Sequence, residues 1–94
     1  MHAVFIEVNA DESRADQARE AIKRGAVPRA RDAGASAGYW LTAQGGRGVA
    51  VLIFDSEEVA RRAAELLKVG EAPPEAPAEV TFRTVEVREV LATL

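Results

Sequence analysis

Residues 48–54 read GVAVLIF, and Val49–Phe54 is the longest uninterrupted apolar run in the chain. Side chains on a β-strand alternate between its two faces, so this run leaves no polar side chain on either face. A strand of this kind needs cover on both faces. The run is far shorter than the ~20 residues that a membrane helix requires, so it is typical of a strand buried in a folded sheet.

Residues 55–70, which follow directly, read DSEEVARRAAELLKVG and are typical of a capped helix. Asp55 is the predicted N-cap, and Glu58 stands three residues later, as in a capping box. Gly70 is the expected helix stop. Between these ends runs one apolar stripe at helical spacing, which would face a sheet. The stripe consists of Val59, Ala60, Ala63, Leu66 and Leu67.

Three further stretches have the alternation of strands, namely residues 3–9 (AVFIEVN), 38–44 (GYWLTAQ) and 80–90 (VTFRTVEVREV). The pair Gly45-Gly46 supplies a tight turn into GVAVLIF, because glycine tolerates positive φ. In residues 80–90 the apolar positions change parity midway. This change predicts a bulge or twist near Thr84.

Asp11, Glu12 and Ser13 offer N-cap chemistry and negative charge for the start of a first helix. Pro28 removes a backbone donor and disfavours helical geometry at the residue before it, so we expect a kink or break there. A short helical turn would follow and end at Gly34. Residues 71–79 hold three of the four prolines and are predicted to form an extended loop within one small domain.

The resulting order is β-α-β-β-α-β, which predicts an α+β, ferredoxin-like fold over residues 1–94 as a single domain. In this arrangement two helices cover one face of a four-stranded antiparallel sheet. The apolar third strand leaves apolar surface on the other face, and an uncovered patch of that size usually marks an interface. We therefore expect a homodimer whose sheets meet face to face and can close into a barrel.

Composition excludes several classes of function. The 94 residues include 12 basic and 15 acidic side chains, for a net charge of −3, which argues against non-specific nucleic-acid binding. Cysteine is absent and His2 is the only histidine, so disulfides, thiolate catalysis and a histidine metal cage are ruled out. No apolar run is long enough for a signal peptide or a membrane span. We expect a cytoplasmic protein without metal or cofactor.

At this level the chain resembles the dimeric α/β-barrel superfamily, and within it the small antibiotic-biosynthesis-monooxygenase-like proteins. The resemblance rests on the element order, on Gly38-Tyr39 at the start of the second strand, and on the segment VAVLIFDSEEVARRAAE. It implies a homodimer with a site between sheet and helices, used in some members for cofactor-independent oxygenation of aromatic polyketides. Asn9 resembles an asparagine of those enzymes. Phe54 stands where they often have tryptophan, and the single tryptophan is Trp40.

Three polar or aromatic side chains are candidates for catalysis. Asn9 could orient a carbonyl or phenolate, or bond the turn that follows its strand. Glu7 lies on a mostly apolar strand face and could act as a base in a cleft, or pair with an arginine such as Arg83 or Arg88. Trp40 could stack on a ligand or pack in the core or across the dimer.

The leading functional hypothesis is an uncharacterised small homodimer that binds a small apolar or aromatic ligand between sheet and helices. One alternative is a cofactor-independent monooxygenase or isomerase acting on an aromatic or enolisable substrate, which requires Asn9 and Trp40 to converge on one cavity. Another is a structural or regulatory dimer without a ligand. The candidate ligand-binding side chains are Phe5, Trp40, Phe54 and Phe82.

Overall fold

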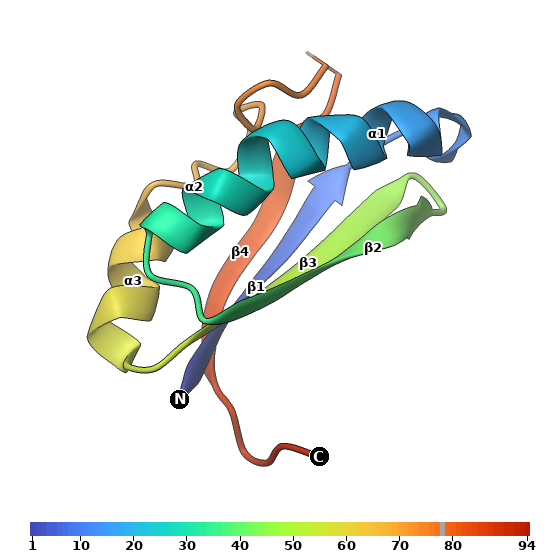
Figure 1. The fold of residues 1–94 in the computed structure, drawn as a ribbon. Helices are drawn as coiled ribbons and strands as arrows, with labels where there is room; N and C mark the ends of the chain where they lie inside the picture. Colours follow the sequence, from blue (N-terminus) through green and yellow to red (C-terminus); the bar gives the residue numbers. More distant parts are fainter. Residues whose placement is uncertain (78) are drawn as a thin grey trace.

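The computed structural model describes residues 1–77 and 79–94 and has the predicted β-α-β-β-α-β order (Figure 1). Four strands form one antiparallel sheet in the order β2-β3-β1-β4, which confirms the α+β fold class. The strands are β1 (His2–Asn9), β2 (Ala37–Gln44), β3 (Arg47–Phe54) and β4 (Thr81–Glu89). The helical segments are a 3-10 turn (Glu12–Arg14), α1 (Ala15–Ala21), a π-helical turn (Ile22–Ala26), α2 (Val27–Asp32) and α3 (Glu57–Glu65).

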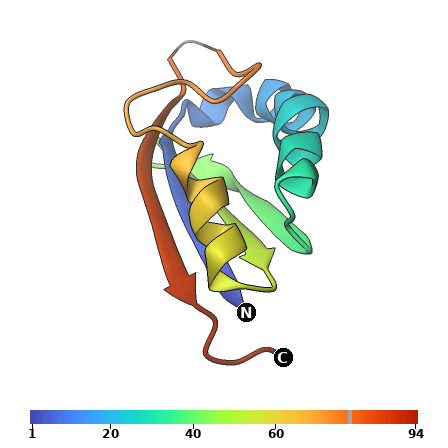
Figure 2. The ribbon, with the colours of Figure 1, turned by 90° about the vertical axis from the view of Figure 1, so that its left-hand side faces the viewer.

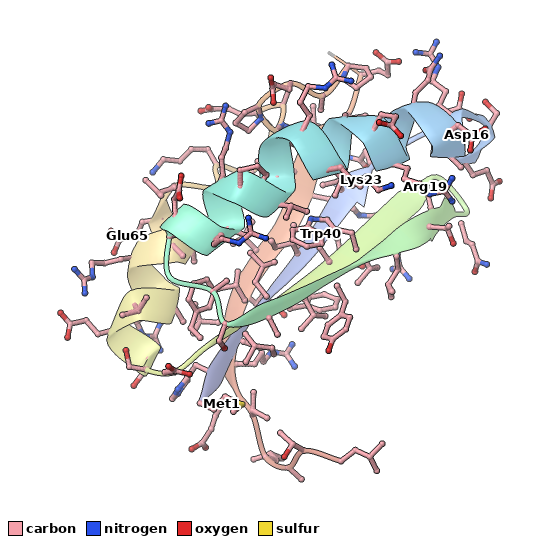
Figure 3. The ribbon with its side chains drawn as sticks, viewed as in Figure 1. Met1, Asp16, Arg19, Lys23, Trp40 and Glu65 are labelled. Carbon is pink, nitrogen blue, oxygen red and sulfur yellow. The ribbon has the colours of Figure 1, made fainter. Side chains whose placement is uncertain are left out.

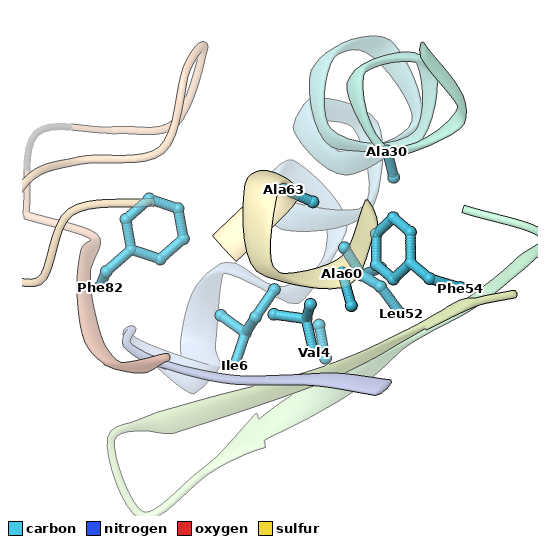
Figure 4. Close-up of a cluster of buried hydrophobic side chains, with 9 residues drawn as sticks. Val4, Ile6, Ala30, Leu52, Phe54, Ala60, Ala63 and Phe82 are labelled. Atoms are coloured by element: carbon cyan, nitrogen blue, oxygen red, sulfur yellow. The ribbon is translucent and has the colours of Figure 1, made fainter. Parts of the chain in front are cut away.

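The helices all lie on one side of the sheet (Figure 2). Between them and the sheet lies the core, in which Val4 of β1 and Phe54 of β3 are fully buried. Ala60 and Ala63 of α3 face these strand side chains (Figure 4). Because alanine is small, α3 approaches the sheet closely at this point. Burial of each large side chain contributes about 1.5–3 kcal/mol to folding.

The predicted bulge in β4 is confirmed. Val8 pairs with Phe82 and Glu7 pairs with Thr84, so Arg83 is an extra residue on β4. A bulge of this kind moves the following residues onto the other parity of the strand. As a result, the apolar side chains before and after the bulge all face the helices, although their spacing in the sequence is irregular.

Of the predicted kink or break at Pro28, the break does not occur. The chain stays helical from Ala15 to Asp32, and its irregular part is the π-helical turn that ends at Ala26, before the proline. Pro28 lies in the first turn of α2. A proline cannot donate to the carbonyl of the preceding turn and its ring clashes there. The wider π-helical turn accommodates this clash, so the helix does not break.

The observed helix ends agree with only some of the predicted ones. Gly34 ends α2 as predicted, with a positive φ of 101° that glycine adopts without steric penalty. The N-cap of α3 is Ser56 and not Asp55, because the Ser56 hydroxyl accepts the backbone N–H three residues on at 3.3 Å. The α3 helix ends at Glu65, well before the predicted stop at Gly70.

Candidate functional site

The strand pairing shows which side chains share the face of the sheet opposite the helices. Phe5 of β1 and Tyr39 of β2 both pair with Val51 of β3, and Leu41 pairs with Val49. Residues directly opposite each other in an antiparallel sheet point to the same face. We call this side the open face and define it by Phe5, Tyr39, Leu41, Val49, Val51 and Ile53.

The open face is apolar and accessible. Tyr39 is 63% exposed and Leu41 is 58% exposed, although both are large side chains. The other four members of the open face are half-buried. Monomeric proteins rarely expose a contiguous apolar patch of this kind, so it is the first candidate for an interaction site.

Charged pairs border the open face on two sides. Glu7 of β1 forms an ion pair with Arg47 of β3, with Oε2 and Nη1 2.9 Å apart. On β4, the Arg88 guanidinium donates to Glu86 at 2.6 Å. The sequence predicted an arginine partner for Glu7 but named Arg83 or Arg88, and this part of the prediction is wrong. Arg47 is the partner because the hairpin brings the start of β3 beside the end of β1.

The three catalytic candidates do not meet. Phe5, Glu7 and Asn9 alternate with the core residues of β1, so all three lie on the side of the sheet that faces away from the helices. Trp40 pairs with Ala50, which is part of the core, and therefore points to the helix side, as Figure 3 shows. Asn9 is exposed and its Nδ2 donates to the hydroxyl of Thr81 on β4 at 3.2 Å. The sheet thus separates Asn9 and Glu7 from Trp40.

The candidate ligand-binding aromatic side chains are also divided. Phe54 and Phe82 belong to the buried core, and Trp40 packs against that core while remaining partly exposed. Phe5 lies on the open face, on the other side of the sheet. The four side chains therefore do not line one pocket. Three of them hold the helix layer on the sheet, and one contributes to the open face.

An apolar groove lies where α3 crosses above β4. It is shallow and open to solvent, with a volume of about 310 Å³. Arg61 on one side of the groove is held by Glu57, to which its Nε and Nη2 donate at 3.0 and 2.6 Å. This hydrogen bond is the main reason that the pKa of Glu57 lies below its usual value of 4.5. The groove is lined by Arg61, Ala64, Glu65, Leu67, Val69, Val85 and Val87.

A second hollow lies on the outer side of α1, between this helix and residues 75–77. Its lining combines charged side chains, among them Asp16, Glu20 and Arg24, with the apolar Ala21, Ala76 and Pro77. Within residues 1–77 and 79–94, no three His, Cys, Asp or Glu side chains gather closely enough to hold a metal ion. None of the helices in this part of the chain is long and apolar enough to cross a membrane.

Comparisons with protein-family models, with curated proteins and with solved structures each found no match to this chain. The class that the geometry defines is therefore a fold class, an α+β domain with a helix-covered and an uncovered sheet face.

Two parts of this surface, Leu41 and the groove, are absent from the predictions made from the sequence. Leu41 was not singled out, although its parity on residues 38–44 places it beside Tyr39 on one face. The groove was missed because Leu67 and Val69 were assigned to the predicted helix and its end. The structure ends the helix earlier, and these side chains turn toward β4.

Proposed function

We propose that the protein acts as a homodimer in which two copies pack through their open faces, with membership of the dimeric α/β-barrel superfamily as part of this proposal. The observation that carries the proposal is the accessible apolar surface around Tyr39 and Leu41. A second copy of the same surface is the partner that matches it best, since a two-fold axis places apolar side chains against apolar side chains. We keep the cytoplasmic location as a prediction from composition.

The bordering charges support this arrangement. The pairs Glu7–Arg47 and Glu86–Arg88 are each neutral overall, so they do not repel a second copy that approaches the apolar surface between them. Interfaces commonly have such an apolar centre with a polar rim.

We further propose that a small apolar or aromatic ligand binds between sheet and helix, in the groove under α3. Val85, Val87 and Leu67 supply an apolar floor, while Arg61 and Glu65 stand at the rim. Ligand sites usually combine an apolar lining with a few polar groups of this kind. A structural or regulatory dimer without a ligand is the alternative, and the absence of buried polar side chains among the described residues favours it.

A cofactor-independent monooxygenase or isomerase has less support. That activity was expected to need Asn9 and Trp40 in one cavity, with Glu7 nearby. The two side chains lie on opposite faces of the sheet, and Asn9 already donates to Thr81. A catalytic site built from these three residues would require a different arrangement of β1 and β2.

The dimer is tested by sedimentation velocity from 1 to 100 µM, concentrations of the order where stable interfaces are occupied. The variant Leu41→Glu places a charge in the centre of the open face, whereas Leu66→Glu places one at a side chain that is 73% exposed at the end of α3. We expect the wild-type chain and Leu66→Glu to sediment at least as dimers, and Leu41→Glu to lose the open-face contact and therefore to sediment as a smaller species than Leu66→Glu. A wild-type chain that stays at 10.1 kDa throughout would contradict the proposal.

Ligand binding is tested separately, by thermal shift with aromatic acids and quinones. Binding in the groove predicts that Ala64→Trp, which fills it, abolishes any shift, whereas Ala18→Trp on the exposed side of α1 does not. If no compound in the panel raises the melting temperature of the wild-type chain, the ligand-free dimer is the better description.

A further inference from the structure

We propose that β4 carries a second self-association surface, in which its outer edge pairs antiparallel with the β4 edge of another copy, centred on Val87. This contact is independent of the open-face dimer. It rests on the position of β4 at the edge of the sheet, on the direction of its backbone groups and on the order of its charges.

The outer edge of β4 is partly occupied and partly accessible. At Phe82 the backbone N–H donates to Glu71 at 2.9 Å and the carbonyl accepts from Gly70 at 2.8 Å. Beyond the bulge, the described residues contain no further backbone partner on this side of β4 (Figure 2). An unpaired strand edge is a template for another strand.

The direction of the backbone groups can be assigned from the end of the strand. The N–H of Val90 donates inward to Met1, which precedes β1, at 3.0 Å. Backbone groups alternate along a strand, so Arg88 and Glu86 also point inward. Val85, Val87 and Glu89 therefore point their N–H and C=O groups outward.

The charges select one register. With Val87 opposite Val87 of the second copy, each Glu86 lies opposite an Arg88 and each Arg88 opposite a Glu86. These are non-hydrogen-bonded positions, where side chains come closest and Cα atoms are about 4.5 Å apart. Moving the two-fold axis by one residue in either direction, which shifts the register by two residues, places Glu86 opposite Glu86 or Arg88 opposite Arg88, and like charges directly opposite are unfavourable. The sequence from Val85 to Glu89 is thus complementary to itself.

The helix side of β4 is consistent with this contact. Val85 and Val87 form the floor of the apolar groove, and Leu67 and Val69 flank it. A two-fold axis through Val87 and perpendicular to the sheet places the two grooves side by side. Each copy then shields the open side of the other groove, and the apolar Val69, which is 64% exposed, gains a neighbour.

Cysteine crosslinking tests the register directly, because the natural chain contains no cysteine. Val87→Cys places two thiols across the axis with Cα atoms about 5.5 Å apart, within the range of a disulfide. We expect it to form a covalent dimer on mild oxidation at least tenfold faster than the exposed control Gln17→Cys. Val85→Cys and Glu89→Cys should each remain monomeric on denaturing gels and form a heterodimer when mixed.

Two further variants separate this contact from the open-face dimer. Glu86→Arg should slow crosslinking of Val87→Cys, and adding Arg88→Glu should restore the rate, because the swap recreates the opposite charges. Crosslinking should also persist in the Leu41→Glu background, since Val87 faces the helix side and cannot meet its copy through the open face. Crosslinking of Val87→Cys no faster than the control, or its loss with Leu41→Glu, would overturn the proposal.

Discussion

Replacing Arg47 and replacing Glu7 should have different effects on the stability of the fold, although the two side chains form one ion pair. The Glu7 side chain is only 14% exposed, whereas Arg47 is 51% exposed. Replacing Arg47 by alanine leaves a mostly buried carboxylate without its cationic partner. Replacing Glu7 by leucine instead removes the charge and adds an apolar side chain opposite Val49. We expect Arg47→Ala to destabilise the fold and Glu7→Leu to leave its stability unchanged or increase it.

The magnitudes follow from these exposures. Removing one partner of a fully buried pair costs about 3–5 kcal/mol. Here water reaches Arg47 and can partly solvate the carboxylate, so the expected cost of Arg47→Ala is about 1–2 kcal/mol. For Glu7→Leu, the lost ion pair is worth about 0–1 kcal/mol, and burial of the added apolar surface offsets it.

Urea unfolding followed by circular dichroism at pH 7 measures both changes in the free energy of unfolding. Several protein concentrations are needed, because self-association stabilises the folded chain by mass action. The double variant Glu7→Leu/Arg47→Ala should recover most of the loss seen in Arg47→Ala. A cost below 0.5 kcal/mol for Arg47→Ala would refute the reasoning, and so would a loss of more than about 2 kcal/mol for Glu7→Leu, since surface pairs rarely contribute that much.

Three further predictions concern the core, a helix end and acid stability. Phe54→Ala should lower the free energy of unfolding by about 3–5 kcal/mol, measured by urea unfolding, because it empties a fully buried site. Gly34→Ala should cost about 1–2 kcal/mol in the same assay, because its φ of 101° disfavours a side chain and its Cβ would lie 3.0 Å from Val59; an unchanged midpoint would contradict this. The hydrogen bond from Arg61 lowers the pKa of Glu57 in the folded chain below its ordinary value of 4.5. The pair therefore stabilises the fold fully above pH 4.5, and this stabilisation is lost as the pH falls through the pKa of Glu57 in the folded chain. The difference in stability between the wild-type chain and Glu57→Gln should therefore shrink on acidification, and a difference that grows would argue against it.

The features that the sequence predicted correctly are those in which the preference of the local residues matches what the whole fold requires. The change of parity of the apolar residues in 80–90 predicts a bulge near Thr84. The extra residue is Arg83, and with it the apolar side chains before and after the bulge face the same side of the sheet. Gly34 ends its helix because a left-handed residue is needed there, and glycine adopts that conformation most easily.

The misplaced features depend on contacts that no local pattern contains. Pro28 is predicted to kink or break its helix, and the preceding π-helical turn accommodates the proline ring so that no break occurs. Asp55 and Ser56 are both good caps, and the path of the chain out of β3 decides between them. The partner of Glu7 depends on how β3 lies beside β1, so charge and spacing could not select Arg47 over the other arginines.

The two proposed contacts use different symmetry axes and can therefore coexist. Open-face packing needs a two-fold axis parallel to the sheet, whereas edge pairing at Val87 needs one perpendicular to it. Both contacts are isologous, and a copy that makes both has two neighbours, so the assembly closes at four copies only when the two axes intersect at a right angle and otherwise extends into a chain. The bulge at Arg83 and the bonds from Phe82 to residues 70–71 confine edge pairing to the second half of β4. The wild-type chain should therefore form species larger than a dimer, whereas Leu41→Glu should stop at an edge-paired dimer, and Val87→Pro, which removes an outward N–H, should stop at an open-face dimer. Species larger than a dimer in either variant would contradict the assignment of two separate contacts.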